Sequence, residues 1–159
     1  MTSPTSARRL STAGFTLIEL VAVMILLGIG AAMAAPRMNR MAMGNKTEGA
    51  ASRLSSDLAY ARILAARWGR PTSLRFSSTG SEYTVTVDTA GSTSPNYVEV
   101  KTVWISRDYA GVHITSPANR VSFSSRGMVS SGHGTFIAQG TNRADTLELY
   151  LTGRTYRAD

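Results

Sequence analysis

The first pattern along the chain is an apolar segment close to the N-terminus. Residues 17–35 read LIELVAVMILLGIGAAMAA and contain a single charged residue, Glu19. As a helix this segment would extend about 28 Å, close to the hydrocarbon thickness of a bilayer. The polar stretch before it contains Arg8 and Arg9 and no acid, an arrangement that holds an N-terminus on the cytoplasmic side. We therefore expect one membrane-spanning helix, with everything after it exported.

After Pro36 the apolar positions follow the period of a helix. Spacings of three and four residues place one set on a single face: Leu54, Leu58, Ala61, Ala65 and Trp68. Gly69 and Pro71 then form a stop signal. Gly44 and Gly49 each cost about 1 kcal/mol relative to alanine, so we expect the helix to bend or partly melt there. The apolar face is expected to pack on a sheet, and a groove for another subunit is the alternative.

From Thr72 onward the period changes to two, which is typical of β-strands. Alternating apolar positions predict strands over residues 74–76, 83–87, 98–104, 112–114, 121–123, 135–138 and 146–151. Turn and loop composition separates them at 78–80, 89–97 and 124–127. The glycine-rich segment 127–134 lacks the ending of a phosphate-binding loop and is expected to be a flexible connection. The chain is therefore expected to be an α+β protein, with a long N-terminal helix packed on an antiparallel β-rich domain.

Three ordinary interpretations of the apolar segment compete with one in which Glu19 has a function inside the apolar helix. It could be a secretory signal peptide with Ala32–Ala34 as its exit, an uncleaved anchor, or a buried core helix. A carboxylate in an apolar helix costs up to about 2.5–3.5 kcal/mol on insertion scales, and a mere anchor has no reason to keep Glu19. The expected partner of the Glu19 carboxylate is a cation. A cut after Gly14 would create an α-amino group four residues before Glu19.

The heptapeptide GFTLIEL, from Gly14 to Leu20, resembles the processing site of type IV prepilins and type II secretion pseudopilins. In that family a prepilin peptidase cuts after the glycine and N-methylates the new first residue, which the resemblance identifies as Phe15. The family's glutamate matches Glu19, and its helix-bending proline matches Pro36. The resemblance covers the first quarter of the chain, and it implies assembly into a filament rather than a particular role there.

A second resemblance, to the GspH/FimT group of minor pseudopilins and minor pilins, spans most of residues 50–157. It rests on a helix ending in ARILAARWGRP, a strand LRF, a turn-bearing VSFSSRG and a final strand running into LTGRTYR. The positions that carry it are Leu58, Ala61, Arg62, Ala65, Phe123, Gly127, Gly153 and Arg154. This resemblance implies a pilin-like fold.

Composition excludes several kinds of chemistry. The chain has no cysteine, which rules out a disulfide scaffold, a cysteine nucleophile and a cysteine-ligated metal. His113 and His133 are the only histidines, and neither has the spacing of a ligand pair. We expect His113 in a strand and His133 solvated in a loop. The sequence therefore predicts no enzyme, no cofactor and no metal site.

A net charge of +7 favours polyanions or anionic lipid as neighbours. Three arginines lie near two tyrosines at the C-terminus, a mixture suited to phosphate contact and base stacking: Arg143, Arg154 and Arg157, with Tyr150 and Tyr156. In FimT-like DNA-uptake pilins a C-terminal G-R-x-R motif is associated with DNA binding. Here Arg154 matches, but Tyr156 replaces the second arginine and the usual FimT-like cysteines are absent. Strand alternation predicts Arg154 and Tyr156 on one face and Arg157 on the other, so a solvated basic edge is the alternative to a nucleic-acid site.

The expected organisation is a leader at 1–14, a transmembrane and assembly helix at 15–36, an amphipathic continuation at 37–70 and a β-rich periplasmic domain at 71–159. Two functions remain. The first is a minor pseudopilin that helps initiate or cap the pseudopilus of a type II secretion system. The second is a FimT-like minor pilin that binds DNA for natural transformation. Both imply a prepilin peptidase, other filament subunits and inner-membrane lipid as partners; DNA is a partner only in the second.

Overall fold

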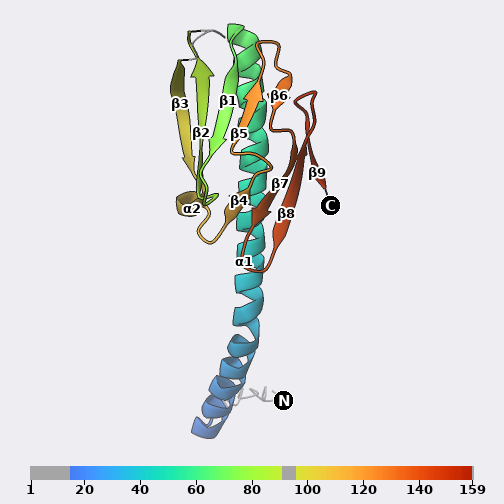
Figure 1. The fold of residues 1–159 in the computed structure, drawn as a ribbon. Coiled ribbons are helices and arrows are strands. Elements are labelled where there is room, and N and C mark those ends of the chain that lie inside the picture. Colours follow the sequence, from blue (N-terminus) through green and yellow to red (C-terminus); the bar gives the residue numbers. More distant parts are fainter. Residues whose placement is uncertain (1–14, 91–95, 159) are drawn as a thin grey trace, which may run out of the picture. The chain divides into compact units, whose positions relative to one another are not determined.

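The computed structural model describes residues 15–90 and 96–158 (Figure 1). The expected leader, with Arg8, Arg9 and Gly14, lies outside the described residues. The chain divides into two compact units after Met38. Each unit is described by itself below.

A single helix begins in the first unit and continues into the second. Helix α1 spans Leu17–Trp68, and Pro36 lies inside it without ending it. The backbone N–H of Glu19 donates to Thr16 Oγ1 at 3.3 Å, the geometry of a helix N-cap. All residues from 15 to 42 are exposed, and α1 is long and apolar enough to cross a bilayer. The prediction of a helix over the apolar segment is confirmed.

In the second unit, α1 buries the face that its sequence predicts. The buried apolar residues of the helix are Ala50, Ala51, Leu54, Leu58, Ala61, Leu64 and Ala65. Trp68 has the right spacing for this face, but it is 51% exposed and lies outside the core. The prediction that this face packs on a sheet is otherwise confirmed.

The prediction that the helix bends or partly melts near Gly44 and Gly49 is wrong, because α1 is helical at both residues. A Cβ on Gly49 would lie 2.8 Å from Cε1 of Tyr109, and a Cβ on Gly44 would lie 3.4 Å from an Nη atom of Arg143. Both glycines therefore make room for side chains that pack on the helix. This close packing outweighs the low helix propensity of glycine.

Nine strands form two antiparallel sheets in the described part of the chain (Figure 1). Sheet A has the order β3-β2-β1-β5-β6, formed by β1 (Thr72–Phe76), β2 (Glu82–Asp88), β3 (Tyr97–Trp104), β5 (Arg120–Phe123) and β6 (Val129–Ser131). Sheet B has the order β4-β7-β8-β9, formed by β4 (His113–Thr115), β7 (Gly134–Gln139), β8 (Ala144–Leu149) and β9 (Thr155–Ala158). A short helix, α2 (Ile105–Asp108), follows β3.

The core joins both sheets to α1. The ring of Phe76 on β1 lies 5.6 Å, centroid to centroid, from Tyr83 on β2 and also from Phe136 on β7. Phe76 therefore connects the two sheets, while Leu54 and Leu58 of α1 are 1% and 0% exposed in the same cluster. The predicted α+β architecture is confirmed.

Three details of the strand prediction are wrong, and one of them is that β9 is absent from the seven strands predicted from the alternation. Residues 127–134 are not only a connection, because β6 forms there and pairs with β5, with Phe123 opposite Val129. A strand of three residues is too short to show a period in the sequence. The last predicted strand ends at Leu149 rather than at Leu151, because the N–H of Gly153 donates to the carbonyl of Tyr150 and closes a turn.

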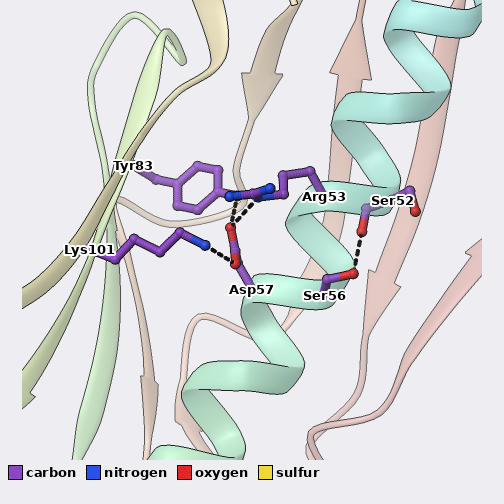
Figure 2. Close-up of polar contacts among 6 residues, drawn as sticks. All are labelled: Ser52, Arg53, Ser56, Asp57, Tyr83 and Lys101. Carbon is purple, nitrogen blue, oxygen red and sulfur yellow. Dashed lines mark hydrogen bonds and ion pairs between the residues drawn. The ribbon is translucent and has the colours of Figure 1, made fainter. Parts of the chain in front are cut away.

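One buried carboxylate ties α1 to the edge of sheet A. Asp57, 4% exposed, accepts a hydrogen bond from Tyr83 Oη at 2.7 Å, from Lys101 Nζ at 2.7 Å and from Arg53 Nε at 3.1 Å. Figure 2 shows the carboxylate between these three side chains. Burial, together with the bond to Asp57, raises the pKa of Tyr83 well above its ordinary value. Because Lys101 lies on β3, this cluster holds an edge strand to the helix.

We expect Asp57→Asn to lower the free energy of unfolding by about 2–3 kcal/mol. The substitution leaves two cations beside a buried site that has lost its negative charge. Asp108→Asn is the matched control, because the Arg107–Asp108 pair is exposed and should change stability by less than about 1 kcal/mol. Urea unfolding of the detergent-solubilised protein measures both. Equal stability of the two variants would contradict this role for Asp57.

Candidate functional site

The predicted processing region lies at the exposed start of α1. Phe15 is 83% exposed and immediately precedes Thr16, the helix cap. Gly14 lies outside the described residues, so the structure places only one side of the expected cleavage position. On the described side, the expected cleavage position borders the first turn of α1, where all residues from 15 to 42 are exposed.

Glu19 lies in the first turn of α1 and is exposed. Thr16 and Glu19 have the spacing of a capping box, in which a threonine caps the helix and a glutamate follows three residues later. A negative charge there also interacts favourably with the helix dipole. Glu19 therefore has a local structural role available in addition to the predicted pairing with a cation, and an experiment must separate the two.

Pro36 has no backbone N–H and cannot donate to the carbonyl of Ala32, four residues earlier. The helix nevertheless continues on both sides of it. The resemblance implies that this proline bends the helix, and its interior position leaves one helical hydrogen bond unmade at that point.

Arg157 is neutralised by two acids rather than free for a ligand. Its Nη2 atom lies 2.6 Å from Oδ2 of Asp145, and its Nη1 atom lies 3.1 Å from Oε1 of Glu48. Hydrogen bonds to Glu48 and Asp145 raise the pKa of the Arg157 guanidinium. These contacts join β9 to β8 and to α1. Arg157 therefore acts as a cross-link within the second unit.

The three predicted arginines do not converge. Arg143 and Arg157 line a hollow that they share with Glu48 and Asp145. Arg154 lines a different one, between β8 and β9, together with Thr152 and two tyrosines. The arrangement agrees with the strand alternation predicted from the sequence.

The hollow at Arg154 is aromatic. The rings of Tyr150 and Tyr156 meet edge to face, with centroids 5.3 Å apart and planes at 86°. The hydroxyl of Tyr150 donates to Glu148 Oε2 at 2.7 Å. This hydrogen bond raises the pKa of Tyr150. A single arginine beside two tyrosines can stack on and ion-pair with a ligand, but it is a smaller basic site than three converging arginines would form.

The histidines lie where the sequence predicts them. His113 is in β4 and His133 is between strands, both exposed. Within the ranges 15–90 and 96–158, no group of three His, Asp or Glu side chains is placed to hold a metal ion.

A cluster that sequence reasoning missed surrounds Arg62 of α1. A Cβ on Gly153 would lie 2.9 Å from Arg62 Cδ and 3.0 Å from the carbonyl oxygen of Gly127. A Cβ on Gly127 would lie 3.3 Å from Arg62 Cγ. The turn after β5 and the turn after β8 therefore meet on one arginine side chain. All three residues carry the second sequence resemblance, but their spacing along the chain gives no sign that they are in contact.

Comparison with known proteins identifies the family. The family model for type II transport protein GspH matches residues 50–153, and the prokaryotic N-terminal methylation motif matches residues 9–35. The chain belongs to the GspH family. This family is part of the group of minor pilins and pseudopilins that the sequence resembles.

Two crystal structures of one minor pilin show the same fold. The type IV minor pilin FimU of Pseudomonas aeruginosa is 19% identical, with a TM-score of 0.58 over 72% of this chain and 90% of FimU. A second crystal form of FimU gives a TM-score of 0.53 at 19% identity, over 70% of this chain and 92% of FimU. The minor pseudopilin EpsH from the Type 2 Secretion System of Vibrio cholerae is 14% identical over 71% of this chain and 96% of EpsH, with a TM-score of 0.47. No curated protein matches the chain in sequence. The likeness to FimU establishes a pilin-like fold for this GspH-family chain.

We expect Gly153→Ala to destabilise this protein by about 2–4 kcal/mol, because Gly153 has φ +74° and its Cβ would also strike Arg62 and a backbone carbonyl. Gly69→Ala is the matched control. Gly69 has φ +62° but open space around it, so its substitution should cost only about 1–2 kcal/mol. Urea denaturation of both variants measures the difference. Equal costs would show that the contact with Arg62 contributes nothing.

Proposed function

We propose that this chain is a minor pseudopilin of a type II secretion system, a structural subunit that helps initiate or cap the pseudopilus for protein export. The observation that carries the proposal is the match of residues 50–153 to the type II transport family in a chain whose residues 9–35 match the methylation motif. The same chain thus combines a processing signal with the globular domain of that family.

The proposed topology is a single pass through the inner membrane. Residues 1–14 are a leader, 15–36 span the membrane, 37–70 continue the helix and 71–159 form the periplasmic domain. The complete exposure of residues 15–42 supports this, since so much exposed apolar surface is stable only in lipid or against other apolar helices. Arg8 and Arg9 support a cytoplasmic N-terminus.

The proposed partners are prepilin peptidase, inner-membrane lipid and the other subunits at the filament tip. Glu19 is proposed to pair with the α-amino group of Phe15 on a neighbouring subunit during docking. A carboxylate in an apolar environment is costly when alone, and a buried cation offsets that cost. Pro36 is proposed to bend the helix within the filament.

A FimT-like role in DNA uptake is the second candidate. The hollow of Tyr150, Tyr156 and Arg154 favours it, since aromatic rings stack on bases and an arginine pairs with phosphate. Arg157 adds little to that site, because Asp145 and Glu48 already neutralise it. The pseudopilin role is therefore the one we propose.

We expect cleavage between Gly14 and Phe15, with N-methylated Phe15 as the mature first residue. Gly14 has no side chain to obstruct a protease at the membrane surface, and α1 begins just after Phe15. Intact-mass analysis of membrane-extracted protein should show loss of residues 1–14 and gain of one methyl group. A mature chain that begins at Ala35 or Pro36 would indicate a secretory signal peptide instead.

We expect Glu19→Gln and Glu19→Ala to be cleaved and inserted normally, yet to enter the filament or its tip complex about tenfold less than the natural protein. Glutamine retains the capping geometry but has no charge, so it separates the two roles of Glu19. The measurement is the fraction recovered with sheared filaments or cross-linked tip complexes. Normal incorporation of Glu19→Gln would assign Glu19 to helix capping and exclude the pairing with Phe15.

A further inference from the structure

Two exposed arginines flank the glycine turns that meet on Arg62. Arg126 directly precedes Gly127, and Arg154 directly follows Gly153. Because the Cβ position of Gly153 is 3.0 Å from the carbonyl oxygen of Gly127, the two turns are in contact. Arg126 and Arg154 therefore lie next to two turns that meet on Arg62, although the three residues are far apart in the sequence.

The two turns are also joined by the backbone. The N–H of Val129, just after the first turn, donates to the carbonyl of Leu151 in the second at 3.0 Å. Each turn is closed by its own hydrogen bond, from Gly127 N to Ser124 O and from Gly153 N to Tyr150 O, both 2.8 Å. The backbone that carries the arginines is therefore fixed before any ligand binds.

No acid neutralises this cluster within residues 15–90 and 96–158. Arg62, Arg126 and Arg154 take part in none of the ion pairs or side-chain hydrogen bonds of that part of the chain. Arg62 is also half-buried. A guanidinium that has lost part of its water and has no carboxylate partner gains from an external anion.

We propose that Arg62, Arg126 and Arg154 form a binding surface for a carboxylate-rich face of another protein subunit. Guanidinium groups bind carboxylates through paired, charge-assisted hydrogen bonds. Exposed apolar side chains lie beside the arginines along the chain: Met128 at 48%, Tyr150 at 47% and Tyr156 at 54% exposure. Methionine, tyrosine and arginine are the residue types enriched in protein–protein interfaces.

An acidic protein fits this surface better than a nucleic acid does. Nucleic-acid affinity is built from many phosphate contacts along an extended basic track, whereas this cluster is compact. Arg157 does not extend it, because Arg157 is bound to Asp145 and Glu48. The inference rests on the proposed function, because a filament subunit has other protein subunits as its neighbours.

The test is a fluorescence-anisotropy titration of the full-length protein in detergent with fluorescein-labelled octaglutamate. The double variant Arg126→Gln/Arg154→Gln should bind about tenfold more weakly than the natural protein, as expected for two partly exposed charge pairs. Both side chains are exposed, so the variant should keep its unfolding midpoint. Raising the salt from about 50 to about 200 mM should weaken the natural protein more than the variant.

The control is Arg75→Gln/Arg120→Gln, which removes the same charge from two arginines opposite each other on β1 and β5. Equal weakening in both double variants, or none in either, would overturn the proposal. A duplex oligonucleotide of equal charge that binds more tightly than octaglutamate, and loses affinity in the Arg126/Arg154 variant, would replace it with nucleic-acid binding. Because the titration uses isolated protein, its failure is distinct from a failure of cleavage or filament entry.

Discussion

Burial of one face of α1 by two sheets is the interaction on which the globular part of this protein depends. Alanine and leucine make up the apolar part of that face, and the small alanines allow close approach of the strands. Leu58, Ala61 and Ala65 are fully buried, and in the same cluster Phe76 connects sheet A to sheet B through Phe136. Neither sheet buries its apolar side without the helix, since each would otherwise expose one face of the core to water.

Polar contacts then fix the edges that apolar packing leaves undetermined. Asp57 holds the edge strand β3 through Lys101, and Glu48 holds the edge strand β9 through Arg157. Both acids are on α1. Hydrophobic burial is non-directional, whereas these hydrogen bonds require one register, so the helix serves as the reference against which both outer strands are aligned.

The same helix differs along its length in how much of it is exposed. Its first turns contain Glu19 and the exposed apolar residues of the processing motif, whereas its later turns position the β-rich domain. Arg62 lies on the later part and supports the two turns at Gly127 and Gly153.

The sequence by itself determined the apolar segment, the helical stripe ending at Ala65, the alternation of the long strands and the processing motif. Each of these follows from the local period of the backbone, which neighbouring residues define. Tertiary structure alone decided that Gly49 accommodates Tyr109 within an unbroken helix, and that β6 forms from three residues by pairing with β5. It also decided that Arg157 binds acids of its own chain and that Arg62 joins two distant turns, because contacts between residues far apart in sequence depend on packing that no local pattern encodes.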